Sequence, residues 1–221
     1  MRHTLTALRV AFVAAAAPGL LLAQVSIQAG IQVGPAEHRT LDAGILVPVS
    51  GTLFGGTLAV LFGNRFEMRT AVLGGHFAER NPPTTDDHDI AELQMLGGVR
   101  VSPWLTVQAG PVLRTFSNTL ARQHWTLLQL GATARVPLGF ETVHGVVRGY
   151  WMPIAAVTGL AQPDLALALA TGVEWRGRRI GASALYAFER YDFPQSGGTR
   201  RLEELSYLQF RMSFWTLAAR H

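Results

Sequence analysis

The sequence predicts an all-β protein: a transmembrane, antiparallel, up-and-down β-barrel of about ten strands behind an N-terminal signal peptide. Apolar residues recur at every second position over long stretches, which indicates strands with one apolar face. The connections between these stretches alternate between short and long, and every tryptophan falls near the end of a stretch. Barrels of eight or twelve strands are the alternatives.

The first 23 residues have the pattern of a secretory signal peptide. Arg2 and Arg9 give a basic start, an apolar stretch follows at 10–22, and Ala23 offers a small residue at the cleavage point. The apolar stretch is shorter than the ~20 residues that a membrane-spanning helix needs, so an uncleaved anchor helix is the weaker alternative. We therefore expect a signal peptide at 1–23 and a single barrel domain at 24–221.

The composition excludes several classes of function. Charged residues make up 15% of the chain and hydrophobic residues 48%, whereas about 25% charged residues is usual in a soluble domain. The formal charge of +4 falls to +2 when Arg2 and Arg9 leave with the leader, which is too small to suggest a nucleic-acid partner. Cysteine is absent, which excludes disulfides, thiolate metal sites and cysteine nucleophiles.

A stretch without charge at 43–64 could be mistaken for a membrane helix. It contains Pro48 and five glycines. Each interior glycine costs a helix about 1 kcal/mol relative to alanine, and a proline costs about 3 kcal/mol. We therefore expect no helix here, but a strand at 53–62. A separate strand at 40–52 would give an odd number and put the N-terminus outside, so we expect 40–52 to form the first loop or an extension of that strand above the membrane. The role of the wider segment 35–52 stays open.

The remaining stretches alternate as VSIQAGIQV does at 25–33, where the apolar residues share one face and the polar residues the other. The runs are about 9–13 residues long, close to the ~9–11 residues with which a tilted strand crosses a bilayer. A proline removes one ladder donor, so we expect a bulge at Gly110–Pro111. The expected strands are 25–34, 53–62, 66–78, 89–101, 104–117, 124–137, 141–152, 164–175, 179–191 and 203–215.

The connections separate into two sets that alternate along the chain. The short set is 63–65, 102–103, 138–140 and 176–178, and the longer, more polar set is 79–88, 118–123, 153–163 and 193–201. Periplasmic turns and extracellular loops alternate in this way in bacterial membrane barrels. Tryptophans at strand ends fit two membrane interfaces, so we expect an aromatic girdle formed by Trp104, Trp125, Trp151, Trp175 and Trp215.

This pattern resembles the small outer-membrane β-barrel families of Gram-negative-type bacteria, over about residues 24–215. The resemblance is one of architecture and rests on no short motif. It implies an outer-membrane location, with outer-membrane lipid and the barrel-assembly machinery as partners, and it favours a monomer. Such barrels usually end on an aromatic residue, whereas here Phe214 and Trp215 are followed by six more residues, TLAARH.

The polar faces of the expected strands place ten charged side chains in the lumen. Six arginines and four glutamates in a narrow interior will mostly pair, because an unpaired buried charge is costly. A structural ion-pair network that fills the barrel is one interpretation, and a narrow channel that favours anions is the other. The residues are Glu67, Arg69, Glu92, Arg100, Arg114, Arg135, Arg148, Glu174, Glu189 and Arg211.

The most polar segment, TTDDHD, contains Asp86, Asp87, His88 and Asp89 on an expected extracellular loop. Acid–histidine pairs can activate water, and carboxylate clusters can hold a divalent cation. The ten strands and the acidic loop are similar to omptins, outer-membrane proteases with two aspartates on one side of the cleft and an Asp–His pair on the other. The far pair is missing here, because His124 has no adjacent acid.

The leading hypothesis is therefore an outer-membrane barrel with a structural or narrow-passage, porin-like role. A hydrolase or a weak cation site at the extracellular rim is the second hypothesis, and a secreted soluble barrel that binds an apolar ligand is the third. No residue is assigned a catalytic role, an enzyme is not the leading expectation, and no cofactor is expected. The sequence names no transported solute.

Overall fold

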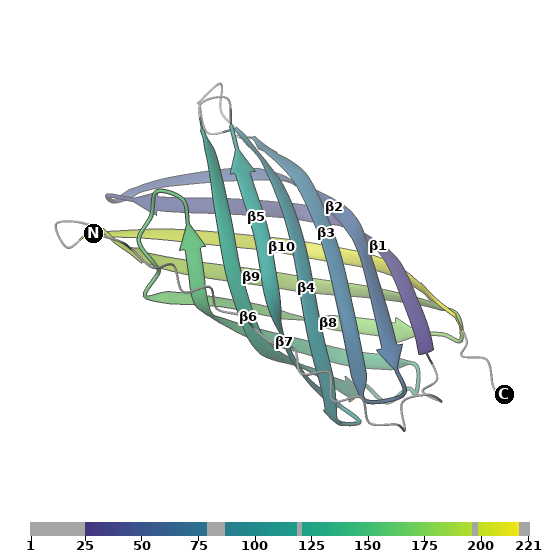
Figure 1. The fold of residues 1–221 in the computed structure, drawn as a ribbon. Helices are drawn as coiled ribbons and strands as arrows, with labels where there is room; N and C mark the ends of the chain where they lie inside the picture. The colour runs from purple at the N-terminus through teal and green to yellow at the C-terminus, as the bar shows by residue number, and fades with distance from the viewer. Residues whose placement is uncertain (1–24, 79–86, 119–120, 196–198, 217–221) are drawn as a thin grey trace, which may run out of the picture.

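The computed structural model describes residues 25–78, 87–118, 121–195 and 199–216. Within these residues, ten antiparallel strands close into a barrel (Figure 1). This confirms the predicted fold class and strand number. The expected signal peptide lies outside the described residues. No helix of the described chain is long and apolar enough to cross a membrane. The strands are β1 (Val25–Asp42), β2 (Ile45–Phe62), β3 (Phe66–Ala78), β4 (His88–Ser102), β5 (Leu105–Ser117), β6 (Arg122–Pro137), β7 (Val143–Val157), β8 (Leu165–Arg176), β9 (Ile180–Pro194) and β10 (Arg200–Trp215).

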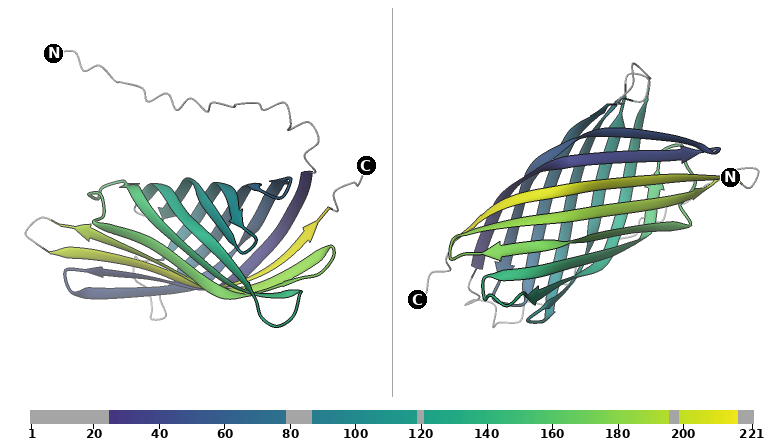
Figure 2. Two further views of the ribbon diagram at one scale, coloured as in Figure 1. Left: turned by 90° about the horizontal axis from the view of Figure 1, so that it is seen from below. Right: turned by 180° about the vertical axis from the view of Figure 1, so that it is seen from behind.

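Every strand pairs with its neighbours in sequence, and the seam between β1 and β10 closes the barrel. This seam runs from the pair Gln28 and Trp215 to the pair Asp42 and Arg201. The right-hand view of Figure 2 shows the two strands side by side, β1 in purple and β10 in yellow. The described sheet therefore has no unpaired edge, which is what a strand structure needs in order to cross lipid.

The two ends of the barrel differ in their connections. Both β1 and β10 have their terminal residues, Val25 and Trp215, at the same end, where the short turns 63–65, 103–104, 138–142 and 177–179 also lie. We call this the terminal end. The strand ends on either side of 79–87, 118–121, 158–164 and 195–199 lie at the opposite end, which we call the loop end. The first connection at the loop end is an exception to the predicted pattern of long loops.

That exception corrects the expectation of a loop at 40–52. Strands β1 and β2 pair up to Asp42 and Ile45, and only Ala43 and Gly44 remain to form the turn, with φ of 48° and 84°. Such left-handed dihedrals suit a two-residue hairpin turn. In the extended part of β2, Val49 points inward and is buried. The alternative expectation, an extension of the second strand, agrees with β2. The first strand, β1, is extended by the same length.

The outer surface of the barrel is apolar around its middle. Large apolar side chains point outward from most strands, among them Ile31, Phe54 and Met68. Nearer the loop end the outward side chains become charged, as in the ion pair of Arg39 Nε with Glu37 Oε1 at 2.8 Å. The arrangement is inverted relative to a soluble protein, and the apolar band is what a membrane barrel presents to lipid.

Proline produces a bulge in β7 and not, as expected, in β5. The register of β5 with β6 is constant through Pro111, whose side chain faces outward. In contrast, the register between β6 and β7 shifts by one residue at Met152–Pro153. A bulge reverses the facing of the residues beyond it, so Met152 before it and Ala155 after it both point into the barrel.

Candidate functional site

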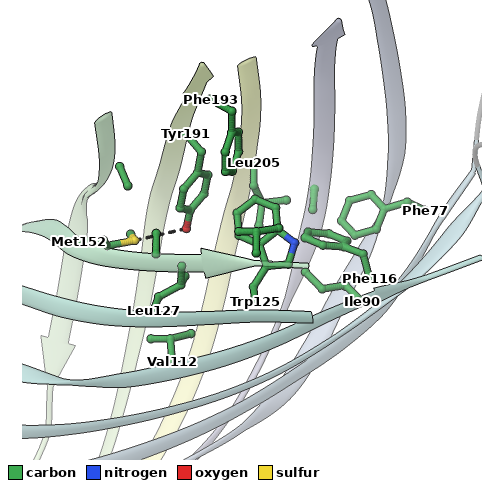
Figure 3. Close-up of a cluster of buried hydrophobic side chains, with 14 of the residues drawn as sticks. Phe77, Ile90, Val112, Phe116, Trp125, Leu127, Met152, Tyr191, Phe193 and Leu205 are labelled. Carbon is green, nitrogen blue, oxygen red and sulfur yellow. Dashed lines mark hydrogen bonds between the residues drawn. The ribbon is translucent and has the colours of Figure 1, made fainter. Parts of the chain in front are cut away.

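A cluster of aromatic rings fills the lumen in the loop-end half of the barrel. We call Phe77, Phe116, Trp125, Tyr191 and Phe193 the aromatic plug. Ring centroids lie 5.6 Å apart for Phe116 and Trp125, 4.8 Å for Trp125 and Tyr191, and 5.6 Å for Trp125 and Phe193. The rings come from β3, β5, β6 and β9, so they meet across the bore (Figure 3). Edge-to-face packing of this kind leaves little space for water.

One residue of the predicted aromatic girdle, Trp125, belongs to the aromatic plug instead. Trp125 is only 1% exposed and lies inside the barrel, because it shares the inward face of β6 with Leu127 and Gln129. Its position near a strand end suggested a membrane interface, but the strand period sets its direction. The expectation that Trp125 faces lipid is therefore wrong.

The other four tryptophans do not form one uniform set. Trp104, Trp151 and Trp175 are exposed on the outside by 53%, 58% and 43%. Trp215 is half-buried at the terminal end, where its Nε1 donates to the carbonyl oxygen of Arg178 at 2.9 Å. Three tryptophans thus lie on the outer surface of the barrel, while Trp215 anchors the last strand to the turn between β8 and β9.

A buried ion cluster crosses the bore next to the aromatic plug. Arg114 of β5 donates through Nε to Glu92 Oε2 at 2.7 Å and through Nη2 to Glu189 Oε2 at 2.7 Å. The Tyr191 hydroxyl donates to the same Glu189 oxygen at 2.8 Å. We call Glu92, Arg114 and Glu189 the central ion cluster. It joins β4, β5 and β9 through the middle of the barrel, and all three side chains are buried.

A second group of charges lies toward the terminal end and is dominated by arginine. Arg69 pairs with Glu67, and Glu174 accepts from Arg135 Nε at 3.2 Å and from Arg176 Nε at 2.7 Å. Arg148 and Arg211 form no ion pair with any described residue. We call the group Glu67, Arg69, Arg135, Arg148, Glu174, Arg176 and Arg211 the arginine chamber.

The structure places all ten predicted lumen charges on the inner face of the barrel and divides them between these groups. Arg100 is the exception to the grouping, since it lies half-buried near the terminal end and makes no ion pair with a described residue. Arg176, which lies in the predicted turn 176–178, also faces the lumen. The glutamines of the predicted polar faces hydrogen-bond to one another or to neighbouring polar groups there, namely Gln32, Gln94, Gln108, Gln129 and Gln209.

A cavity of about 380 Å³ opens at the loop end. We call it the mouth pocket. Its wall includes His38 from β1, His88 from β4 and Glu203 from β10. His38 Nδ1 lies 3.0 Å from His88 Nε2, and His38 Nε2 lies 3.5 Å from Glu203 Oε2. Arg201 Nε donates to Glu203 Oε1 at 2.8 Å.

These contacts form a line from a buried carboxylate through two imidazoles to the pocket. Glu203 and His38 are both buried, and Phe116 of the plug stacks on the His38 ring with centroids 4.8 Å apart. A carboxylate that contacts one nitrogen of a histidine fixes its orientation, which is how general bases are usually held. Sequence reasoning missed His38 because it lies in the doubtful segment 35–52, although the phase of the last strand puts Glu203 inside.

The predicted rim site is not assembled by the described residues. Asp86 lies outside them, Asp87 is exposed, and the two residues after it point in opposite directions. His88 faces the mouth pocket, whereas Asp89 faces outward and pairs with His76, Oδ1 to Nδ1, at 2.8 Å. Among the residues with known placement, no three histidine or acidic side chains form a metal-binding group.

Comparisons with known proteins identify the fold and nothing finer. No protein-family model matches the chain, and no curated protein matches it. The outer membrane protease OmpT from Escherichia coli is similar, with a TM-score of 0.51 and 9% identity over 87% of this chain and 96% of that one. The translocator domain of the autotransporter NalP from Neisseria meningitidis gives 0.44 and 12% identity over 89% and 91%. Neisserial surface protein A gives 0.38 and 12% identity over 84% and 96%. The chain thus shares the closed β-barrel fold of the outer membrane protease.

Proposed function

We propose that the chain is an outer-membrane protein whose barrel is closed to ions and whose role in the membrane is structural. The observation that carries this proposal is the aromatic plug backed by the central ion cluster. Together they occupy the bore between the mouth pocket and two cavities of about 60 and 10 Å³ on the other side. A narrow passage, the other half of the leading hypothesis, would need a continuous polar path through Phe116 and Trp125.

The apolar outer band supports the membrane location. An even strand number puts both termini at one end, which is the periplasmic end in bacterial barrels of this type. On that basis the loop end and its mouth pocket face the cell exterior. A secreted soluble barrel would expose the same apolar band to water, so a folded sample that stays soluble without detergent would contradict this assignment.

Single-channel recording in a planar bilayer tests the closed barrel. The sample is the refolded chain without residues 1–23, with a folded gel band that shifts on heating in SDS as proof of folding. We expect no discrete conductance steps from this chain. The double variant Phe116→Ala and Trp125→Ala removes two adjacent rings of the plug, and we expect it to conduct.

Trp151→Ala is the matched control for that variant, because it removes an exposed tryptophan on the outside of the barrel. We expect no conductance steps from this variant. Regular steps from the folded unmodified chain would instead make the protein a channel and would remove the structural proposal.

A second candidate function is hydrolysis at the mouth pocket, favoured by the line of Glu203, His38 and His88. In this mechanism His88 takes a proton from water at the pocket, while His38 holds the His88 ring and is itself held by Glu203 from its other side. The test is an assay of peptide and ester hydrolysis with the folded barrel in detergent. His38→Gln should remove the activity and His76→Gln, an exposed histidine outside the pocket, should keep it. Absence of hydrolysis from the unmodified barrel would end this candidate.

A further inference from the structure

The inner face of the terminal half carries more positive charge than its carboxylates can balance. Six arginines face inward there, against two glutamates, among the described residues. The arginines are Arg69, Arg100, Arg135, Arg148, Arg176 and Arg211, and the glutamates are Glu67 and Glu174. Side chains buried in the lumen have little contact with bulk water, so the surplus charge requires another source of compensation.

The ion pairs of the chamber show which arginines carry the surplus. Glu67 is held by Arg69, and Glu174 is shared by Arg135 and Arg176. No carboxylate in the described chain is left in the chamber for the remaining two arginines.

Those two arginines have only neutral partners or none. Arg211 Nη2 donates to Gln32 Oε1 and to Gln209 Oε1, both at 3.2 Å. Arg148 makes no hydrogen bond through its side chain within the described chain. The Nε atoms of Arg148 and Arg211 are both buried without a hydrogen-bond partner. Buried guanidinium donors without acceptors are expensive, so a native structure normally supplies an acceptor.

The two small cavities lie where such an acceptor would bind. Both are lined by Arg69, Arg148 and Arg211, so these side chains lie between them. The larger cavity has a volume of about 60 Å³, several times the ~10–15 Å³ that one water needs. Tyr150 and Tyr207 add hydroxyl groups to its wall.

The opposite wall of this larger cavity carries two carboxylates, which already have a cationic partner. It reaches Glu92 and Glu189, whose carboxylates are both bound to Arg114 in the central ion cluster. The smaller cavity extends to Arg176 and Trp215 near the terminal end. The path toward the free arginines therefore leads from the terminal end, since the plug closes the other side.

We propose that Arg148 and Arg211, with Arg69 beside them, form a binding site for a small inorganic oxyanion of about phosphate size inside the lumen. Guanidinium groups present paired donors that match two oxygens of a phosphate-like group, which favours an oxyanion over a halide. The small volume excludes larger organic phosphates. The site does not depend on the proposed closed barrel, because an anion can enter from the terminal end whether or not the plug opens.

Calorimetric titration of the folded barrel with inorganic phosphate, at constant ionic strength, tests this site. We expect saturable binding with about one phosphate per chain. Losing one charged hydrogen-bonding group should weaken binding about tenfold or more in Arg148→Gln and in Arg211→Gln. Arg100→Gln is the matched control, because Arg100 faces inward in the same half but lines neither cavity, and it should bind phosphate as the unmodified chain does.

Thermal unfolding provides a second readout that a purely structural role would not move. Phosphate should raise the unfolding temperature of the unmodified barrel more than chloride does, and Arg148→Gln should lose that difference. Should a glutamine variant fail to give the heat-shifted band, Arg148→Lys keeps the charge without the paired donors and should still weaken binding. Absence of saturable phosphate binding, or equal weakening by Arg100→Gln, would overturn the proposal.

Discussion

The two halves of the lumen balance their charges in different ways. In the loop-end half, Arg114 is placed between two glutamates and the aromatic plug fills the remaining space. In the terminal half, the arginines outnumber the glutamates, and Arg148 makes no ion pair with a described residue. The first arrangement stabilises a closed interior through pairs formed within the chain, and the second depends on groups that the chain does not provide. One barrel therefore combines a half whose buried charges are paired within the chain with a half that has an excess of arginine.

The largest expected effect concerns the central ion cluster. Arg114→Ala leaves Glu92 and Glu189 buried side by side without their cation, which should lower the free energy of unfolding by about 3–5 kcal/mol. Urea unfolding in detergent micelles measures it. The control, Arg39→Ala, breaks an exposed ion pair on the outer surface and should cost ~0–1 kcal/mol. Equal costs for the two variants would remove the central ion cluster as a stabilising feature.

The next test compares two arginines inside the terminal half. Arg69→Gln leaves Glu67 buried without its partner and should cost about 3 kcal/mol. Arg148→Gln removes a charge that has no partner, so without phosphate it should change stability little or increase it. Urea unfolding of both variants in phosphate-free buffer gives the comparison. A large loss in Arg148→Gln would show that its charge is balanced within the chain.

A smaller effect is expected at the mouth pocket. Glu203→Gln weakens the contacts to Arg201 and His38 and should lower the free energy of unfolding by about 1.5–3 kcal/mol. Amide hydrogen exchange should rise in the loop-end parts of β1 and β10. Glu204→Gln changes the adjacent, outward-facing carboxylate and provides the control, with little expected change in either measurement.

The smallest effect concerns the turn at the loop end. Ala43 adopts a left-handed conformation that costs a non-glycine residue about 1 kcal/mol, so Ala43→Gly should raise stability by roughly that amount. Asn64→Gly, in a turn at the terminal end where the non-glycine residue has negative φ, should give no gain. Thermal unfolding followed by the gel-band shift compares the two. A gain from Asn64→Gly alone would contradict the strain assigned to Ala43.

The strand period made most of the fold predictable. Alternation locates the strands to within a few residues and places ten charged side chains on the inner face, because facing depends only on position within a strand. It failed at 35–52, where a separate strand would have made the strand number odd and a loop was expected, although the strands continue to Asp42 and Ile45. It also misplaced Trp125, whose nearness to a strand end was given more weight than its phase with Gln129.

The pairings inside the lumen could not be predicted from the sequence. The period assigns Arg114 to the interior, but its contact with Glu189 joins strands that are far apart in the sequence and depends on the barrel's diameter and shear. His38 and Glu203 meet for the same reason, across the seam of β1 and β10. One-strand patterns give the direction of a side chain, whereas its partner across the bore is a property of the closed barrel.

The seam between β1 and β10 also has a consequence for how the chain folds. It pairs Gln28 with Trp215, almost the whole described length apart, so it closes a very long loop of chain. Contacts of such sequence separation form slowly, and the last strand leaves the synthesis machinery after all the others. Until β10 docks, β1 and β9 each expose a row of unpaired backbone groups that invites association with other chains. A chain that stops before Arg200 would keep both edges open, and aggregation rather than loss of local structure is its expected fate.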